Sequence, residues 1–128
     1  MEIIVTSVMV EDQNKARTFY TEKLGFVVKQ DIPMGEFNWL TVLPAGENNG
    51  VELLLEPNEF PPAKVYQTAL FEANIPATMF GVDSVDDTFN ILNERGVFFK
   101  TEPKTVGNIR LAVFDDTCGN LIQIVEQL

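Results

Sequence analysis

An internal repeat is the feature that most constrains the fold of this chain. Residues 5–56 and 77–126 carry the same order of apolar, polar and turn positions. An offset of 72 residues relates the two stretches until one residue is dropped near the end of the second predicted helix, and an offset of 71 relates them afterwards. The matched pairs include Val5 with Ala77, Val10 with Val82, Gly25 with Gly96, Leu40 with Leu111 and Glu52 with Gln123. Chance similarity rarely keeps one register over such a length, so the pattern indicates a duplication.

Each repeat has the pattern of a strand, a helix and three further strands. In the first repeat, runs rich in β-branched and aromatic residues predict strands at 3–10, 26–29, 37–43 and 51–55. A helix is expected between the first two strands, beginning after Asp12 as its N-cap and ending at Gly25. In the second repeat, strands are predicted at 77–82, 97–100, 108–114 and 120–125, with a helix from Ser84 to Gly96. The fold class is therefore α+β, with tandem βαβββ modules.

The length of the chain favours one domain built from both modules. A chain of 128 residues suits a single hydrophobic core, so we expect one domain over residues 1–128. Module one covers about residues 1–56 and module two about residues 76–128. Several prolines interrupt the connector at 57–75, which is expected to hold a short helix at 63–74.

Strand alternation divides the side chains of each module between two faces. Leu40 and Val42, with their counterparts Leu111 and Val113, suit packing under the helices. The opposite face mixes apolar and polar side chains, which suits neither solvent nor a core and predicts a curved mixed sheet around a ligand cavity. The predicted ligand-binding residues are Val5, Ser7, Met9, Trp39, Thr41, Glu52, Met79, Arg110, Phe114 and Gln123.

Composition limits the partners and the chemistry. The chain has 9 Lys and Arg against 19 Asp and Glu, a formal net charge of −10, which disfavours nucleic acid and anionic membranes as partners. Residues 1–7 lack the positive start and the small-residue cleavage site of a signal peptide, and no apolar run approaches the length of a membrane helix. The single cysteine, Cys118, fits a reducing compartment, so a cytoplasmic location is expected. The chain contains no histidine, the commonest general base and transition-metal ligand.

Several motifs resemble the vicinal oxygen chelate superfamily, also called the glyoxalase/bleomycin resistance protein/dioxygenase superfamily. They are Phe19-Tyr20 with Leu24-Gly25-Phe26, Val51-Glu52-Leu53, and the turn from Asp115-Asp116 to Gly119-Asn120. The resemblance covers nearly the whole chain. It implies paired βαβββ modules that form a curved sheet around a cavity, often within a homodimer.

The resemblance also implies where metal ligands would stand. Enzymes of the family carry His, Gln or Glu ligands at four equivalent places, which correspond here to Val5, Glu52, Ala77 and Gln123. Only Glu52 is a strong donor and Gln123 a neutral one, while a catalytic divalent site needs about three protein ligands. We therefore expect no metal and no cofactor.

Three functions remain open from the sequence. The leading hypothesis is a metal-free protein that binds a small, partly apolar, anionic molecule, with Arg110 recognising its charge and Trp39 stacking on it. The alternative is an enzyme of the same superfamily, lyase-like or dioxygenase-like, with an atypical metal site or with Glu52 as acid or base. A structural or protein-partner role is the third. Glu52 could instead pair with Arg110, Arg110 with another acid, and Trp39 could line a dimer interface.

Overall fold

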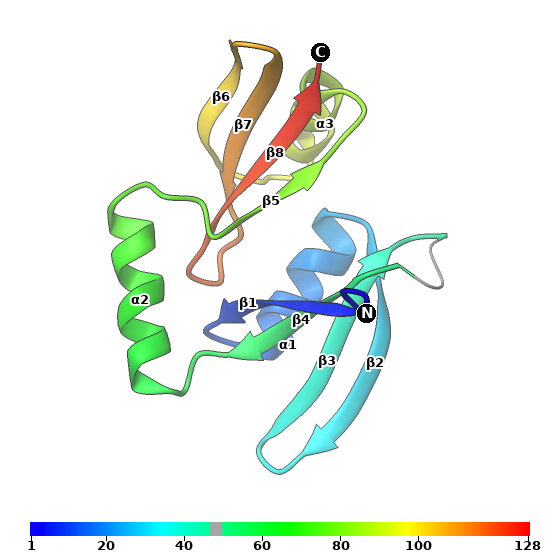
Figure 1. Ribbon diagram of the computed structural model, residues 1–128, viewed down its shortest axis with the longest axis vertical. Helices are drawn as coiled ribbons and strands as arrows, with labels where there is room; N and C mark the ends of the chain where they lie inside the picture. Colours follow the sequence, from blue (N-terminus) through cyan, green and yellow to red (C-terminus); the bar gives the residue numbers. More distant parts are fainter. Residues whose placement is uncertain (47–49) are drawn as a thin grey trace. The chain divides into compact units, whose positions relative to one another are not determined.

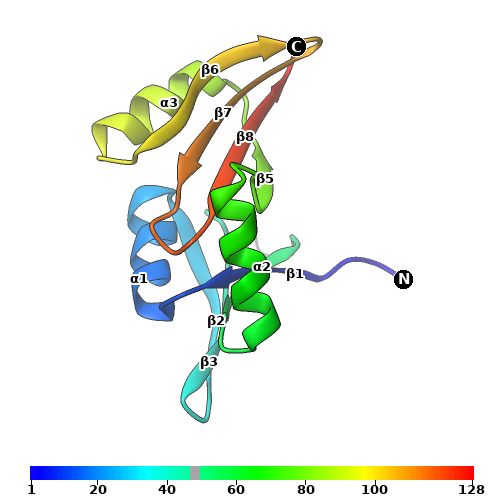
Figure 2. The same cartoon turned by 90° about the vertical axis from the view of Figure 1, so that its left-hand side faces the viewer.

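The computed structural model describes residues 1–46 and 50–128. The chain divides into two compact units, Met1–Tyr66 and Gln67–Leu128. Each unit contains the predicted βαβββ order, which confirms the α+β class with tandem modules. Each unit contains one four-stranded sheet. Figure 1 and Figure 2 show α1 on one face of the first sheet and α3 on one face of the second.

In the first unit, the strands pair in the order β1-β4-β3-β2, with β1 parallel to β4 and the other pairs antiparallel. The elements are β1 (Val5–Val10), α1 (Gln13–Thr18), its π-helical continuation η1 (Phe19–Lys23), β2 (Phe26–Met34), β3 (Phe37–Pro44) and β4 (Glu52–Pro57). The outer strands β1 and β2 do not pair with each other in the described part of the chain, so the sheet is open rather than a barrel.

The second unit repeats this arrangement. Its strands pair in the order β5-β8-β7-β6, with β5 parallel to β8. The elements are β5 (Thr78–Gly81), α3 (Val85–Glu94), β6 (Phe99–Val106), β7 (Ile109–Asp115) and β8 (Leu121–Gln127). A further helix, α2 (Pro61–Glu72), spans the division between the units. Within the described ranges, no helix combines the length and the apolar content that crossing a membrane requires.

The predicted helix boundaries rest on local capping. The Asp12 carboxylate accepts hydrogen bonds from the backbone N–H groups of Asn14 and Lys15, and Ser84 caps α3 by accepting from the N–H of Asp87. These bonds satisfy donors that a helix leaves unpaired in its first turn. Gly25 and Gly96 follow the two helices with φ angles of +82° and +85°, a conformation that glycine adopts without strain.

The core of the first unit lies between its sheet and the helix formed by α1 and η1. The buried apolar side chains on this side are Val8, Val10, Ala16, Phe19, Tyr20, Leu40, Val42, Leu53 and Leu55. Gln13 links α1 to the sheet by hydrogen bonds. Its side-chain amide donates to the carbonyl oxygens of Asn38 and Leu55 and accepts from the Asn38 N–H. The predicted helix-facing role of Leu40 and Val42 is confirmed.

The core of the second unit contains a chain of aromatic contacts. Phe89 of α3 meets Phe99 with ring centroids 4.7 Å apart, and Phe99 meets Phe114 at 5.7 Å. Phe114 has no exposed surface, and Ala112, Ile122 and Ile124 are buried as well. The helix-facing side of β7 therefore carries Ala112 and Phe114.

The prediction that Leu111 and Val113 face the helix is wrong, and its cause lies in the strand register. In the first unit Thr41 pairs with Leu54, whereas the counterpart of Leu54, Val125, pairs with Leu111. The third strand of the second unit is thus displaced by one residue relative to its last strand. Because side chains alternate along a strand, a displacement of one residue moves every side chain to the other face.

Polar contacts fasten α2 to the second unit. Gln67 is the buried residue of α2, and its amide donates to the carbonyl of Cys118 and to the side-chain oxygen of Asn120, each at 3.1 Å. The buried Asp116 carboxylate accepts from the backbone N–H groups of Cys118 and Asn120 and from the Asn120 amide. The turn between β7 and β8 is therefore organised by Asp116, a residue type that favours turns.

Candidate functional site

Glu52 lies at the centre of a hydrogen-bonded group on the face of the first sheet opposite α1. Its Oε1 accepts from the side-chain amide of Gln30 at 2.7 Å and from the hydroxyl of Thr41 at 2.6 Å. The Thr41 hydroxyl in turn accepts from the backbone N–H of Gln30 at 3.1 Å. Both side-chain bonds end on the same oxygen, so they orient the carboxylate while its Oε2 accepts no hydrogen bond within the described part of the chain.

These bonds also set the charge state of Glu52. The hydrogen bond from Gln30 is the largest influence that lowers the pKa of the Glu52 carboxyl, followed by the bond from Thr41, and desolvation opposes them. Lys29 adds a smaller lowering of this pKa through its charge. Donors that bind the ionised form stabilise it, so Glu52 is a carboxylate at neutral pH. Such a group accepts hydrogen bonds, but it is poorly matched to proton abstraction near neutrality.

Gln30 is a site residue that the sequence did not reveal. The pairing of β2 with β3 changes register between Val28 and Gln30, where one extra residue forms an irregularity in the strand. This shift places Gln30 opposite Thr41 and on the same face as Glu52. Bulges of this kind re-aim side chains near functional sites. Simple alternation along β2 contains no signal for it.

Six predicted residues share the Glu52 face. The strand register places Val5 opposite Glu52, Ser7 opposite Leu54 and Met9 opposite Glu56, and cross-strand partners lie on one side of a sheet. The predicted residues on this face are Val5, Ser7, Met9, Trp39, Thr41 and Glu52. Whether they bind a ligand stays a prediction.

An apolar surface adjoins the carboxylate. Trp39 lies two residues before Thr41 and opposite Ile32, which is 50% exposed. Val5 on β1 lies on the same face and is partly exposed, whereas Leu54 of β4 is buried at 6% exposure. The face therefore combines an oriented acceptor with aromatic and aliphatic side chains, a combination typical of small-molecule sites.

The second unit presents a different open face. Gln123 on β8 lies opposite Met79 on β5 and opposite Val113 on β7, so Met79 and Gln123 share a face as predicted. A hollow of about 560 Å³ adjoins this face, lined by Met79, Gly81, Val82, Asp83, Val125, Glu126 and Gln127. Ala77 precedes β5, and its backbone N–H donates to the carbonyl of Leu121.

Two of the predicted ligand-binding residues, Arg110 and Phe114, do not lie on the face of the sheet where the sequence placed them. Arg110 and Phe114 pair with Glu126 and Ile122, so both lie on the α3 side of the sheet rather than beside Gln123. Arg110 forms a bidentate ion pair with Asp86 in the first turn of α3, through its Nε and Nη2 at 2.8 Å each. This pairing is the main cause that lowers the pKa of Asp86 and raises the pKa of Arg110. The one-residue displacement of β7 explains both errors.

Four positions of this chain correspond to metal ligands in the enzymes that it resembles, but together they lack the donors that a divalent ion needs. Val5 and Ala77 have no ligating side-chain atom, and one oxygen of Glu52 already accepts two hydrogen bonds. Over residues 1–46 and 50–128, no three or more His, Cys, Asp or Glu side chains gather as a possible metal site. The donor set therefore falls short of the roughly three protein ligands that a catalytic zinc-type site uses.

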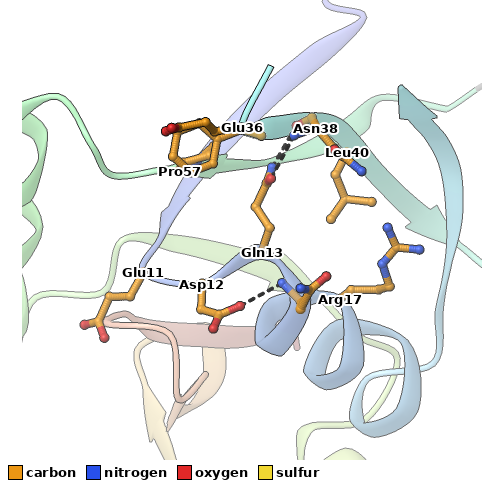
Figure 3. A pocket seen from close by; sticks show the side chains of 10 residues that line it. Glu11, Asp12, Gln13, Arg17, Glu36, Asn38, Leu40 and Pro57 are labelled. Atoms are coloured by element: carbon orange, nitrogen blue, oxygen red, sulfur yellow. Dashed lines mark hydrogen bonds between the residues drawn. The ribbon is translucent and has the colours of Figure 1, made fainter. Parts of the chain in front are cut away.

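A smaller pocket lies on the α1 side of the first sheet (Figure 3). Its volume is about 280 Å³, and its lining includes Asp12, Gln13, Arg17 and Asn38. These polar groups serve the fold: Asp12 caps α1, Gln13 binds Asn38, and Arg17 forms an ion pair with Asp31. We therefore place the candidate site on the Glu52 face.

The ionisation of Glu52 gives a direct test of this geometry. Because the folded-state pKa is lowered, the stabilisation from ionised Glu52 is fully present above the unfolded-state pKa and is lost as the pH falls through the folded-state value. Replacing the buried hydroxyl in Thr41→Val should raise the titration midpoint of Glu52, measured by NMR of its side-chain carboxyl carbon. Thr41→Ser, which keeps the hydroxyl, should retain the low midpoint. The same midpoint in wild type and Thr41→Val would contradict the hydrogen-bonding scheme.

Known proteins share this fold and much of this sequence. The profile of the Glyoxalase/Bleomycin resistance protein/Dioxygenase superfamily matches residues 3–124. The protein YurT of Bacillus subtilis (strain 168) is 56% identical over 127 residues, covering 99% of this chain and 100% of YurT. The crystal structure of UcmS2 is similar with a TM-score of 0.85 and 30% identity, covering 99% of this chain and 98% of that one. TnmS3, an antibiotic binding protein from Streptomyces sp. CB03234, gives a TM-score of 0.79 and 31% identity, covering 100% of this chain and 97% of TnmS3. This chain belongs to the Glyoxalase/Bleomycin resistance protein/Dioxygenase superfamily.

Proposed function

We propose that this protein is a metal-free small-molecule-binding protein that holds a partly apolar ligand against the Glu52 face. The observation that carries the proposal is the carboxylate of Glu52, which is oriented by Gln30 and Thr41 and shares its face of the sheet with Trp39 and Val5. Superfamily membership and similarity to an antibiotic binding protein support small-molecule binding. A group whose orientation is fixed before binding loses little entropy when the ligand arrives.

The chemistry of Glu52 favours binding over catalysis. A general base works best with a pKa near the working pH, which buried carboxylates reach when desolvation dominates. Here the hydrogen bonds outweigh desolvation and lower the pKa. The alternative of an enzyme with Glu52 as acid or base therefore lacks the environment that this chemistry needs, and an atypical metal site lacks donors.

The predicted anionic character of the ligand loses its main support. That expectation rested on Arg110, and the ion pair with Asp86 on the α3 side removes the guanidinium from the face of Gln123. The partly apolar character is supported by Trp39, Ile32 and Val5, which share this face of the sheet. We therefore expect a partly apolar ligand whose charge is complementary to the groups around Glu52. A cytoplasmic location stays a prediction from the sequence.

We also propose that two chains associate as a symmetric homodimer. Large apolar side chains remain exposed on the face of the first sheet opposite α1, where Ile32 and Met34 of β2 are 50% and 62% exposed. Patches of this kind mark association or binding surfaces. Light scattering at micromolar concentration should give twice the 14.4 kDa mass of one chain. The mass of a single chain would contradict the dimer.

Metal analysis tests the proposed metal-free state. The protein purified without chelators should contain well under one equivalent of zinc, nickel, iron or manganese, because Val5 and Ala77 offer no ligand. Added metal should leave its melting temperature unchanged, since a ligand stabilises a protein only when it binds the folded state. One equivalent of metal, retained by wild type and lost in Glu52→Gln, would overturn the proposal and favour the enzyme.

A further inference from the structure

We infer that the ligand of the Glu52 face is a hydrogen-bond donor of neutral or positive charge, of the class of aromatic amines, amides and phenols, which donates to Oε2 of Glu52. The inference deepens the proposed function and rests on it. The sequence predicted an anionic ligand, whereas we now infer a neutral or cationic one.

The first step is the directionality of the Glu52 group. Gln30 and Thr41 both donate to Oε1, so the two hydrogen bonds that the described residues make to this carboxylate end on one oxygen. An ionised carboxylate has no proton to donate and accepts only. Its second oxygen, Oε2, therefore offers the ligand an acceptor and nothing else. A ligand group that also carries only lone pairs would face it without any hydrogen bond.

The second step is the free-energy cost of covering Oε2 of Glu52 with a ligand group that has no hydrogen-bond donor. The Glu52 side chain is partly shielded, since it lies between Val5 on β1 and the fully buried Thr41 on β3. A ligand that covers it removes water from Oε2. A covered charged group without a hydrogen bond is unfavourable, and a site built for a donor therefore rejects an analogue that lacks one.

The third step is the charge of the face. Glu52 and Glu56 alternate with Leu54 along β4 and place two carboxylates on it. Arg17 forms an ion pair with Asp31, which lies opposite Leu40 on the α1 side of the sheet, so this cation is not on the Glu52 face. Lys29 is the cation whose charge reaches Glu52, and it is the smallest of the influences on that carboxyl. The face therefore attracts donors and cations more than anions.

The fourth step concerns the body of the ligand. Trp39 is half-buried, lies on the same face two residues from Thr41, and is flanked by Ile32 across the β2–β3 pair. Aromatic rings stack favourably on such a side chain. A planar molecule with a donor at its rim can meet Trp39 with its ring and Oε2 of Glu52 with its N–H or O–H.

Four naphthalene probes that share one ring system test this inference. Naphthalenemethylamine is a cationic donor, naphthol a neutral donor, methoxynaphthalene has no donor, and naphthoate is an anion. Calorimetry on the full chain should show the amine and naphthol binding about tenfold to a hundredfold more tightly than methoxynaphthalene, the range expected for a hydrogen bond to a charged group. Naphthoate should bind most weakly. Equal affinities, or a preference for naphthoate, would overturn the inference.

Two substitutions separate the hydrogen bond from general charge. Glu52→Gln keeps an oxygen for Gln30 and Thr41 to bind but replaces Oε2 by an N–H₂ donor, so the preference for the amine and naphthol should vanish and naphthoate should gain. Glu56→Gln removes the same charge from the same face of β4 and should leave the preference for naphthol over methoxynaphthalene intact. Loss of that preference in both variants would contradict a specific bond to Glu52. Circular dichroism establishes that each variant is folded.

A Trp39→Ala variant distinguishes failure of the inference from failure of the proposed function. If the probes bind wild type with Trp39-dependent affinity but without preference for donors, the face binds ligands and only the inference is wrong. If no probe binds, or binding is indifferent to Trp39, the proposed site is wrong and the inference falls with it.

Discussion

Strand register decides which side chains of this protein enter a core and which stay available to a ligand. Each unit has a helix on one face of a four-stranded sheet, so each strand sends alternate side chains to the helix and to the open side. In the first unit this arrangement buries Leu40, Val42 and Leu53 and places Trp39, Thr41 and Glu52 on the opposite face. The chemistry of the open face therefore follows from pairing that the core enforces.

Glu52 stands at a position that supplies a metal ligand in related enzymes, but its neighbours in this protein differ from those of a metal site. Its neighbours on the sheet are Val5, which cannot bind a metal, and the donors Gln30 and Thr41, which bind the carboxylate themselves. Donors around a carboxylate stabilise its charge and leave it an acceptor. We therefore propose that a position that supplies a metal ligand in related enzymes binds an organic hydrogen-bond donor in this protein.

Most of the fold was predictable from the sequence, because its signals are local. Asp12 and Ser84 cap helices, Gly25 and Gly96 end them, and the repeat gives the element order. In the first repeat the composition of the candidate face was predictable, because alternation alone places Val5, Trp39, Thr41 and Glu52 on one side of the sheet.

The errors arose where pairing changes by one residue. The irregularity in β2 brings Gln30 to Glu52, and the displaced β7 turns Arg110 and Phe114 toward α3. A sequence offset cannot detect either change, since both depend on hydrogen bonds between strands. The ion pair of Arg110 with Asp86 was an open alternative from the sequence, because Arg110 could pair with an acid other than Glu52. Its bidentate geometry is characteristic of arginine and carboxylate.

The claim that the Glu52 face is the ligand site is tested most directly by mapping backbone and indole N–H chemical shifts while naphthalenemethylamine is added. We expect the largest changes at Gln30, Trp39, Thr41 and Glu52, which lie on adjacent strands of the first sheet. Changes concentrated around Arg110 and Asp86 on the α3 side of the second sheet, with the Glu52 face unaffected, would contradict the account.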